Sequence, residues 1–182
     1  AELHQSFERY ETNSSRRPKD SIEDYLLWFH GSAQVPTEYR YIVEKWLKRF
    51  ERALFCSEKD WIHGDCHLGN ILWRDEDPLL IDFDDVGLGW RGQDLWLIAP
   101  GNSAQQKEYR RAFFRGYGNH SLYREVEEKL PDLRALRMMN YVRWISTRWP
   151  DPAFKTAFPI FGEPDFWLRE AHALTRLFEH GE

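Results

Sequence analysis

Two residues stand at a spacing that suits phosphoryl transfer. Asp65 and Asn70 are five positions apart in residues 63–70, which read HGDCHLGN. This is the H-x-D-x-x-x-x-N spacing of a kinase catalytic loop, in which the Asp accepts the proton of the substrate hydroxyl and the Asn binds metal. Phosphoryl transfer needs an oriented hydroxyl and neutralised phosphate charge, and these two side-chain types supply both. The spacing therefore predicts a phosphotransferase.

A further carboxylate follows two short apolar runs. Mg²⁺ prefers oxygen ligands and usually takes one or two protein carboxylates, so a site at Asn70 calls for an acidic residue nearby. Asp82 follows the apolar run 79–81 and opens the tripeptide DFD, which differs from the kinase DFG only in Asp84. We therefore predict Asp65 and Asp82 as catalytic residues, with Asn70 and Asp82 as ligands for the Mg²⁺ that accompanies ATP.

A metal hydrolase is the alternative chemistry. His63, Asp65 and His67 alternate and would share one side of a strand, with Cys66 as a soft ligand. The glycines within this segment favour a loop over a strand, and the other histidines show no ligand spacing. Solvated acids in capped turns would explain the aspartates but not the spacing from Asp65 to Asn70. The phosphotransferase is the better interpretation.

Apolar patterns predict the elements that position these residues. Short apolar runs broken by turns predict strands at 61–62, 71–73 and 79–81, and the polar turn 74–78 makes the last two a hairpin. Capping residues and helical spacing predict helices at 1–10, 20–29, from Pro36 onwards, 93–98, 103–117, 121–129, 133–149 and 164–179. The expected fold class is α+β, mostly helical, with a small hairpin beside the site.

Tryptophans and arginines leave two questions open. Trp96, Trp144 and Trp167 fall in helical patterns, which favours a helical core over exposed stacking platforms for sugars or bases. One predicted helix carries arginines that form either a substrate-facing patch or a solvated face, of which the solvated face is the commoner outcome: Arg134, Arg137, Arg143 and Arg148.

Composition narrows the possible partners and location. The chain of 182 residues is 42% hydrophobic, which is ordinary for a globular protein, and its net charge of −5 leaves no basic footprint for nucleic acid. Two cysteines, Cys56 and Cys66, are too few for a disulfide framework and favour a reducing compartment. No apolar stretch has the length of a membrane span. We expect a cytoplasmic monomer with neither nucleic-acid nor membrane partners.

These motifs resemble the aminoglycoside phosphotransferase and choline kinase superfamily, which has a protein-kinase-like fold. The resemblance rests on HGDxHxxN at 63–70 and IDF at 81–83, and GNILWR at 69–74, QDLW at 93–96 and WPDPAF at 149–154 narrow it to the bacterial stress response kinase A type. The resemblance implies an ATP- and magnesium-dependent serine/threonine protein kinase of the cytoplasm. It also implies that His63 and Asp94 support the structure of the catalytic loop.

The resemblance also sets expectations for domains and substrates. Neither a Gly-rich loop nor a strand lysine for the ATP phosphates precedes residue 63, so we expect residues 1–182 to be a single C-terminal catalytic lobe, without the N-terminal lobe that covers ATP. This chain alone would then be an incomplete enzyme. The same motifs fit a kinase of small-molecule hydroxyls, such as an aminoglycoside, choline or homoserine, and a non-catalytic scaffold is a further alternative.

Overall fold

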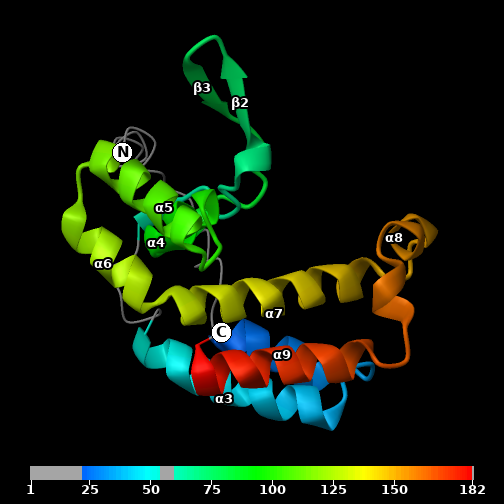
Figure 1. Ribbon diagram of the computed structural model, residues 1–182. Coiled ribbons are helices and arrows are strands. Elements are labelled where there is room, and N and C mark those ends of the chain that lie inside the picture. Colours follow the sequence, from blue (N-terminus) through cyan, green and yellow to red (C-terminus); the bar gives the residue numbers. More distant parts are fainter. Residues whose placement is uncertain (1–21, 54–59, 182) are drawn as a thin grey trace. The chain divides into compact units, whose positions relative to one another are not determined.

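The computed structural model describes residues 22–53 and 60–181, and these divide into two compact units. The loop unit comprises residues 60–130, and the helical unit comprises 22–53 together with 131–181. Figure 1 shows the helices and strands of both units. The helix expected at 1–10 lies outside the described residues.

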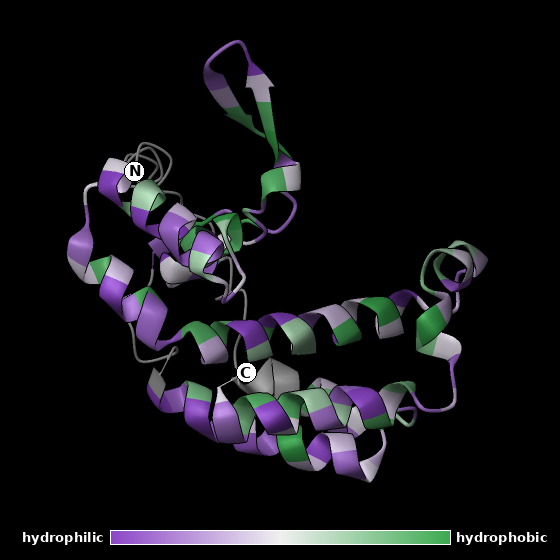
Figure 2. Ribbon diagram, viewed as in Figure 1, coloured by the Kyte–Doolittle hydropathy of each residue, from purple (hydrophilic) through white to green (hydrophobic). Residues whose placement is uncertain are grey.

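Two small antiparallel sheets lie in the loop unit. β1 (Asp60–Ile62) pairs with β4 (Gly87–Gly89), and β2 (Ile71–Arg74) pairs with β3 (Asp77–Leu80), with Ile71 opposite Leu80. The predicted hairpin is thereby confirmed. Both of its strands carry hydrophobic residues, visible in green in Figure 2, and Leu72, Trp73 and Leu79 are exposed.

Strand β4 was not predicted, because glycine has low β-propensity and occupies two of its three positions. The reason for glycine lies in the packing. A Cβ on Gly89 would lie 2.4 Å from both Ile62 Cδ1 and Gln93 Oε1, so these two side chains occupy the space that a larger residue would need.

Short helices complete the loop unit. They are η1 (Leu68–Asn70), α4 (Gly92–Leu95), η2 (Trp96–Ile98), α5 (Ala104–Tyr117) and α6 (His120–Glu128). Ser103 and Asn119 cap α5 and α6 by accepting hydrogen bonds from the amides of Gln106 and Leu122. The fully buried Arg110 of α5 donates to Glu127 of α6, at 2.5 Å from Nε to Oε1, and to the carbonyls of Ala99 and Gly101. Arg110 thus joins α5, α6 and the segment before α5.

The helical unit consists of α2 (Ile22–Gly31), α3 (Thr37–Ala53), α7 (Leu130–Arg148, whose first residue belongs to the loop unit), α8 (Pro152–Ala157), η3 (Pro159–Gly162) and α9 (Phe166–His180). Its core contains Trp46, whose Nε1 donates to the Leu174 carbonyl at 3.1 Å and so joins α3 to α9. The Arg49 guanidinium donates to both carboxylate oxygens of Asp132, at 2.6 and 2.9 Å, and joins α3 to α7.

The predicted fold class is confirmed, and two details are corrected. Helix α8 lies between the predicted helices 133–149 and 164–179, where no helix was expected; Pro152 stands at its first turn, where proline is tolerated, and Asp151 caps it. Trp96 lies in the core as predicted, whereas Trp144 is 39% exposed. Among the described helices, none combines the length and apolarity needed to cross a bilayer.

Candidate active site

Asp94 fixes the start of the loop that carries Asp65. This carboxylate is 1% exposed; its Oδ2 accepts from the His63 amide at 2.7 Å and its Oδ1 from the Gly64 amide at 2.8 Å. Hydrogen bonds to a buried carboxylate are among the stronger ones in proteins. Gly64 has a φ of 84°, a left-handed conformation that glycine adopts without a steric penalty. The loop therefore leaves β1 in one defined direction.

The His63 side chain joins this loop to the segment that carries Asp82. The ring is fully buried; its Nδ1 accepts from the Asp65 amide at 3.3 Å, so Nε2 carries the proton and donates to the Ile81 carbonyl at 2.9 Å. The ring also contacts Phe83, with centroids 4.7 Å apart. His63 thus touches both motifs.

Asn70 makes a second connection between the two motifs. Its Nδ2 donates to the Asp65 carbonyl at 3.0 Å, and its own carbonyl accepts from the Ile81 amide at 3.0 Å. Asp82, the next residue, is exposed and has a φ of 62°, which is uncommon outside glycine. The backbone at Asp82 therefore has a left-handed conformation directly after the bonded residue Ile81.

His67 is a member of this site that the phosphotransferase interpretation did not use. Its Nε2 lies 3.6 Å from Asp65 Oδ2, and its Nδ1 accepts from the Gly69 amide at 2.9 Å. A Cβ on Gly69 would lie 2.8 Å from His67 Cε1, so the ring packs against a glycine. The H-x-G spacing of residues 67–69 does not reveal this contact, because the contact depends on the turn into η1.

The interpretation of this segment as the metal site of a hydrolase loses support from the structure. Across residues 22–53 and 60–181, no three His, Cys, Asp or Glu side chains are grouped as a metal site would require. Burial, with smaller contributions from Asp94 and Asp65, raises the pKa of the Cys66 thiol to about 12. Without a bound metal, Cys66 is therefore a neutral thiol at physiological pH, which does not suit a nucleophile.

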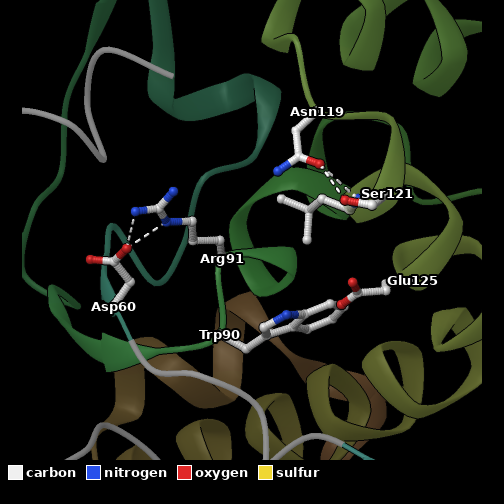
Figure 3. A pocket seen from close by; sticks show the side chains of 7 residues that line it. Asp60, Trp90, Arg91, Asn119, Ser121 and Glu125 are labelled. Atoms are coloured by element: carbon white, nitrogen blue, oxygen red, sulfur yellow. Dashed lines mark hydrogen bonds and ion pairs between the residues drawn. The ribbon is translucent and has the colours of Figure 1, made fainter.

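A cavity of about 420 Å³ lies in the loop unit but includes none of the predicted site residues. Figure 3 shows the side chains that line it: Asp60, Trp90, Arg91, Asn119, Ser121, Leu122 and Glu125. Several of these groups bond to one another, since Arg91 Nε donates to Asp60 and Ser121 Oγ donates to Asn119. The Lys129 ammonium lies 4.6 Å from the Trp90 ring centroid. We assign the cavity no part in the chemistry of Asp65.

Comparison with known sequences identifies related proteins. The pattern of the family described as "Phosphotransferase enzyme family" (APH) matches residues 1–129. Stress response kinase A of Escherichia coli (strain K12) is 33% identical over 167 residues, which cover 85% of this chain and 50% of that protein. Serine/threonine protein kinase RdoA of Salmonella typhimurium (strain LT2) is 34% identical over the same length and coverage. The chain spans about half the length of the curated relatives it matches.

Two solved structures share the fold. Amicoumacin kinase hAmiN, in complex with AMP-PNP, Ca²⁺ and Ami, has a TM-score of 0.58 at 15% identity, covering 94% of this chain and 55% of that chain. A choline/ethanolamine kinase family protein from Mesorhizobium loti has a TM-score of 0.58 at 14% identity, covering 97% and 60%. The observed fold is thus of the type found in these kinases.

Proposed function

Because this chain belongs to the phosphotransferase enzyme family, we propose that its protein transfers the γ-phosphoryl group of ATP to a serine or threonine hydroxyl of a protein substrate. The names of the relatives from Escherichia coli and Salmonella support a protein acceptor. The names of the two solved structures are those of small-molecule kinases, so a small alcohol is the second candidate acceptor.

The observation that carries the proposal is the bonding of both backbone groups of Ile81. Its amide donates to the Asn70 carbonyl and its carbonyl accepts from His63, which brings the chain at Asp82 next to the chain at Asn70. Two oxygen-bearing side chains thereby leave adjacent backbones. This arrangement supports Asn70 and Asp82 as the pair of metal ligands.

The donor atoms suit Mg²⁺, which prefers oxygen ligands and few protein carboxylates. Because Asn70 Nδ2 donates to the Asp65 carbonyl, Oδ1 is the amide atom that would bind a cation, and Asp82 would contribute a carboxylate oxygen. When bound, Mg²⁺ neutralises charge on the nucleotide phosphates.

We assign Asp65 to the acceptor hydroxyl. As the hydroxyl oxygen bonds to the γ-phosphorus, the bond from that phosphorus to the bridging oxygen of ATP breaks and ADP leaves. Asp65 accepts the hydroxyl proton, and Asn70 and His63 hold the Asp65 backbone through its carbonyl and its amide. We assign His63 and Asp94 the role of holding the loop backbone, without contact to the substrate.

Two substitutions in the full-length protein separate these roles. Asp65→Asn should reduce phosphate transfer from radiolabelled ATP by roughly 10²- to 10⁴-fold, because the proton acceptor is lost, while ATP affinity stays within about threefold. Asp82→Ala should reduce magnesium-dependent ATP binding as well, measured by calorimetry. Asp77→Asn, an exposed acid on β3, is the matched control and should leave both unchanged. Equal loss of ATP binding in both site variants would contradict the divided roles.

The acceptor class needs its own measurement. Radiolabel that appears as phosphoserine or phosphothreonine in protein, and not in a panel of aminoglycoside, choline and homoserine, would support the protein kinase. The reverse result would favour the small-molecule kinase. A full-length protein that binds neither ATP nor Mg²⁺ would instead be a scaffold.

A further inference from the structure

A row of aromatic and arginine side chains, of which Tyr141, Trp144 and Arg148 are exposed, lies in the helical unit. Arg137, Tyr141, Trp144 and Arg148 recur at the spacing of one side of α7. Phe154 and Phe158, within and directly after α8, contact the rings of this row. We call these six residues the α7–α8 face.

The rings of this face are held in place although they are open to solvent. The Trp144 ring centroid lies 5.0 Å from that of Phe154 and 5.4 Å from that of Phe158, and Tyr141 stacks on Trp144 at 6.3 Å. The Arg148 guanidinium lies 5.0 Å from the Trp144 centroid. Nevertheless Trp144 is 39% and Tyr141 is 45% exposed. A partner would therefore meet large side chains that are already ordered, which lowers the entropic cost of binding.

The charge of this region is opposite to that of the whole chain. The chain contains 30 acidic and 25 basic residues, whereas residues 130–157 contain five basic side chains and only two acidic ones. Both acids are engaged locally, since Asp132 binds Arg49 and Asp151 accepts from the Ala153 amide as the cap of α8. A basic region on an acidic protein favours an acidic partner by charge complementarity.

We propose that the α7–α8 face binds an acidic segment of a partner protein, with apolar side chains of that segment against Tyr141 and Trp144 and a carboxylate on Arg148. Trp, Tyr and Arg are the residues that contribute most often to the energy of protein interfaces. Nucleic acid fits less well, because the net charge of −5 of the whole chain opposes a polyanion. This inference does not depend on phosphoryl transfer, since Asp65 lies in the other unit.

The test is the binding of a fluorescein-labelled peptide of about 12 residues, in which Glu alternates with Leu and Phe, to the full-length protein. Fluorescence anisotropy at physiological salt should show saturable binding, and a peptide with Lys in place of Glu should not bind. Arg148→Glu should weaken binding at least about tenfold, since it reverses the charge beside Trp144. Arg176→Glu makes the same charge change at an exposed position of α9 and should weaken binding less than about twofold.

A second variant tests the aromatic half of the face. Trp144→Ala should weaken binding at least about tenfold, whereas Trp73→Ala, which removes an exposed tryptophan of β2, should have little effect. Trp144→Ala removes contacts to α8, so its melting temperature is measured in parallel to check that the protein stays folded. Arg148→Glu tests the same face with its aromatic rings intact. Equal weakening by Arg148→Glu and Arg176→Glu would overturn the proposal. So would failure of the full-length protein to bind the peptide, or tighter binding of a single-stranded oligonucleotide that Arg148→Glu abolishes.

Discussion

A single buried carboxylate, Asp94, receives two backbone amides of the loop before Asp65. An Asp94→Asn variant keeps the size of the side chain but offers only one acceptor oxygen, so one amide of His63 or Gly64 loses its partner. An unsatisfied buried amide costs about 1–3 kcal/mol. We expect the free energy of unfolding in urea to fall by about that amount.

The control for this measurement is Asp77→Asn, because Asp77 is an exposed acid in the same unit. It should change the free energy of unfolding by less than about 0.5 kcal/mol. A stability of Asp94→Asn equal to that of Asp77→Asn would show that the two hydrogen bonds do not contribute.

Cys66 gives a prediction about reactivity. The thiolate is the species that reacts with iodoacetamide, and the raised pKa of Cys66 suppresses it in the folded protein. In a Cys56→Ser background, alkylation of Cys66 at pH 8 should be at least roughly 100-fold slower in the folded protein than in urea. Mass spectrometry of the modified peptide measures both rates, and similar rates would show that the thiol is not protected.

The contact between His67 and Asp65 predicts that His67→Ala and Gly69→Ala have the same effect on phosphate transfer. His67→Ala removes the ring 3.6 Å from the Asp65 carboxylate, and Gly69→Ala would displace that ring because its Cβ would lie 2.8 Å from Cε1. Both should lower phosphate transfer about tenfold and leave ATP affinity unchanged, because Asp65 loses a group that orients it. A large loss in only one variant would separate the ring from the turn that holds it.

The sequence predicted some of these relationships and missed others. The spacing from Asp65 to Asn70, followed by the hairpin and Asp82, was enough to expect these residues at one place. The role of Asp94 came from a family resemblance, since nothing in its spacing links it to His63. The contact of His67 with Asp65 depends on backbone conformation after the loop, which no local pattern encodes.

At the scale of secondary structure, capping residues determined which helices were foreseen. Helix α5 was predicted from Ser103 to Tyr117, and Ser103 is its N-cap, while Gly118 ends it with a φ of 79°. Strand β4 and helix α8 were missed because Gly87, Gly89 and Pro152 are usually signs of irregular structure. The glycines of β4 are explained by a tertiary contact that only the structure shows, whereas the Asp151 cap before Pro152 is a helix-start signal that the sequence contains.

Gly116 gives a test of helix stability in α5. It lies in the last turns of the helix, is exposed, and a Cβ there would meet no heavy atom within 4 Å. Since glycine is a poor helix former, Gly116→Ala should raise the free energy of unfolding by about 0.5–1 kcal/mol. Chemical denaturation measures the change, and Gly118→Ala, at a positive φ, should instead lower stability.

For the molecule as a whole, Glu170 of α9 predicts how stability changes with pH. Burial raises the pKa of the Glu170 carboxyl above its ordinary value of 4.5. A raised folded-state pKa gives stability that is present below about pH 4.5 and lost as pH rises through the folded pKa. Glu170→Gln should therefore be more stable than the native protein at pH 7, and the difference should shrink as the pH falls towards 4.5.

Melting temperatures at several pH values measure this difference. Glu179→Gln lies on the same helix at an exposed position and serves as the control, with little change at any pH. A Glu170→Gln variant less stable than the native protein at pH 7 would mean that the charged carboxylate has a stabilising partner.

The bonding of Ile81 bears on how such a protein can be switched off. If its regulation required Asp82 to swing away from the loop, the bonds of Ile81 to Asn70 and His63 would have to break together. Each hydrogen bond stabilises the conformation by about 0.5–1.5 kcal/mol, so an inactive conformer that lacks both would have a low population in the free protein. We expect regulation of this protein to act on the access of substrates to the site and not on the conformation of Asp82. Slow exchange of the Ile81 amide with deuterium would show that the hydrogen bonds of Ile81 stay formed.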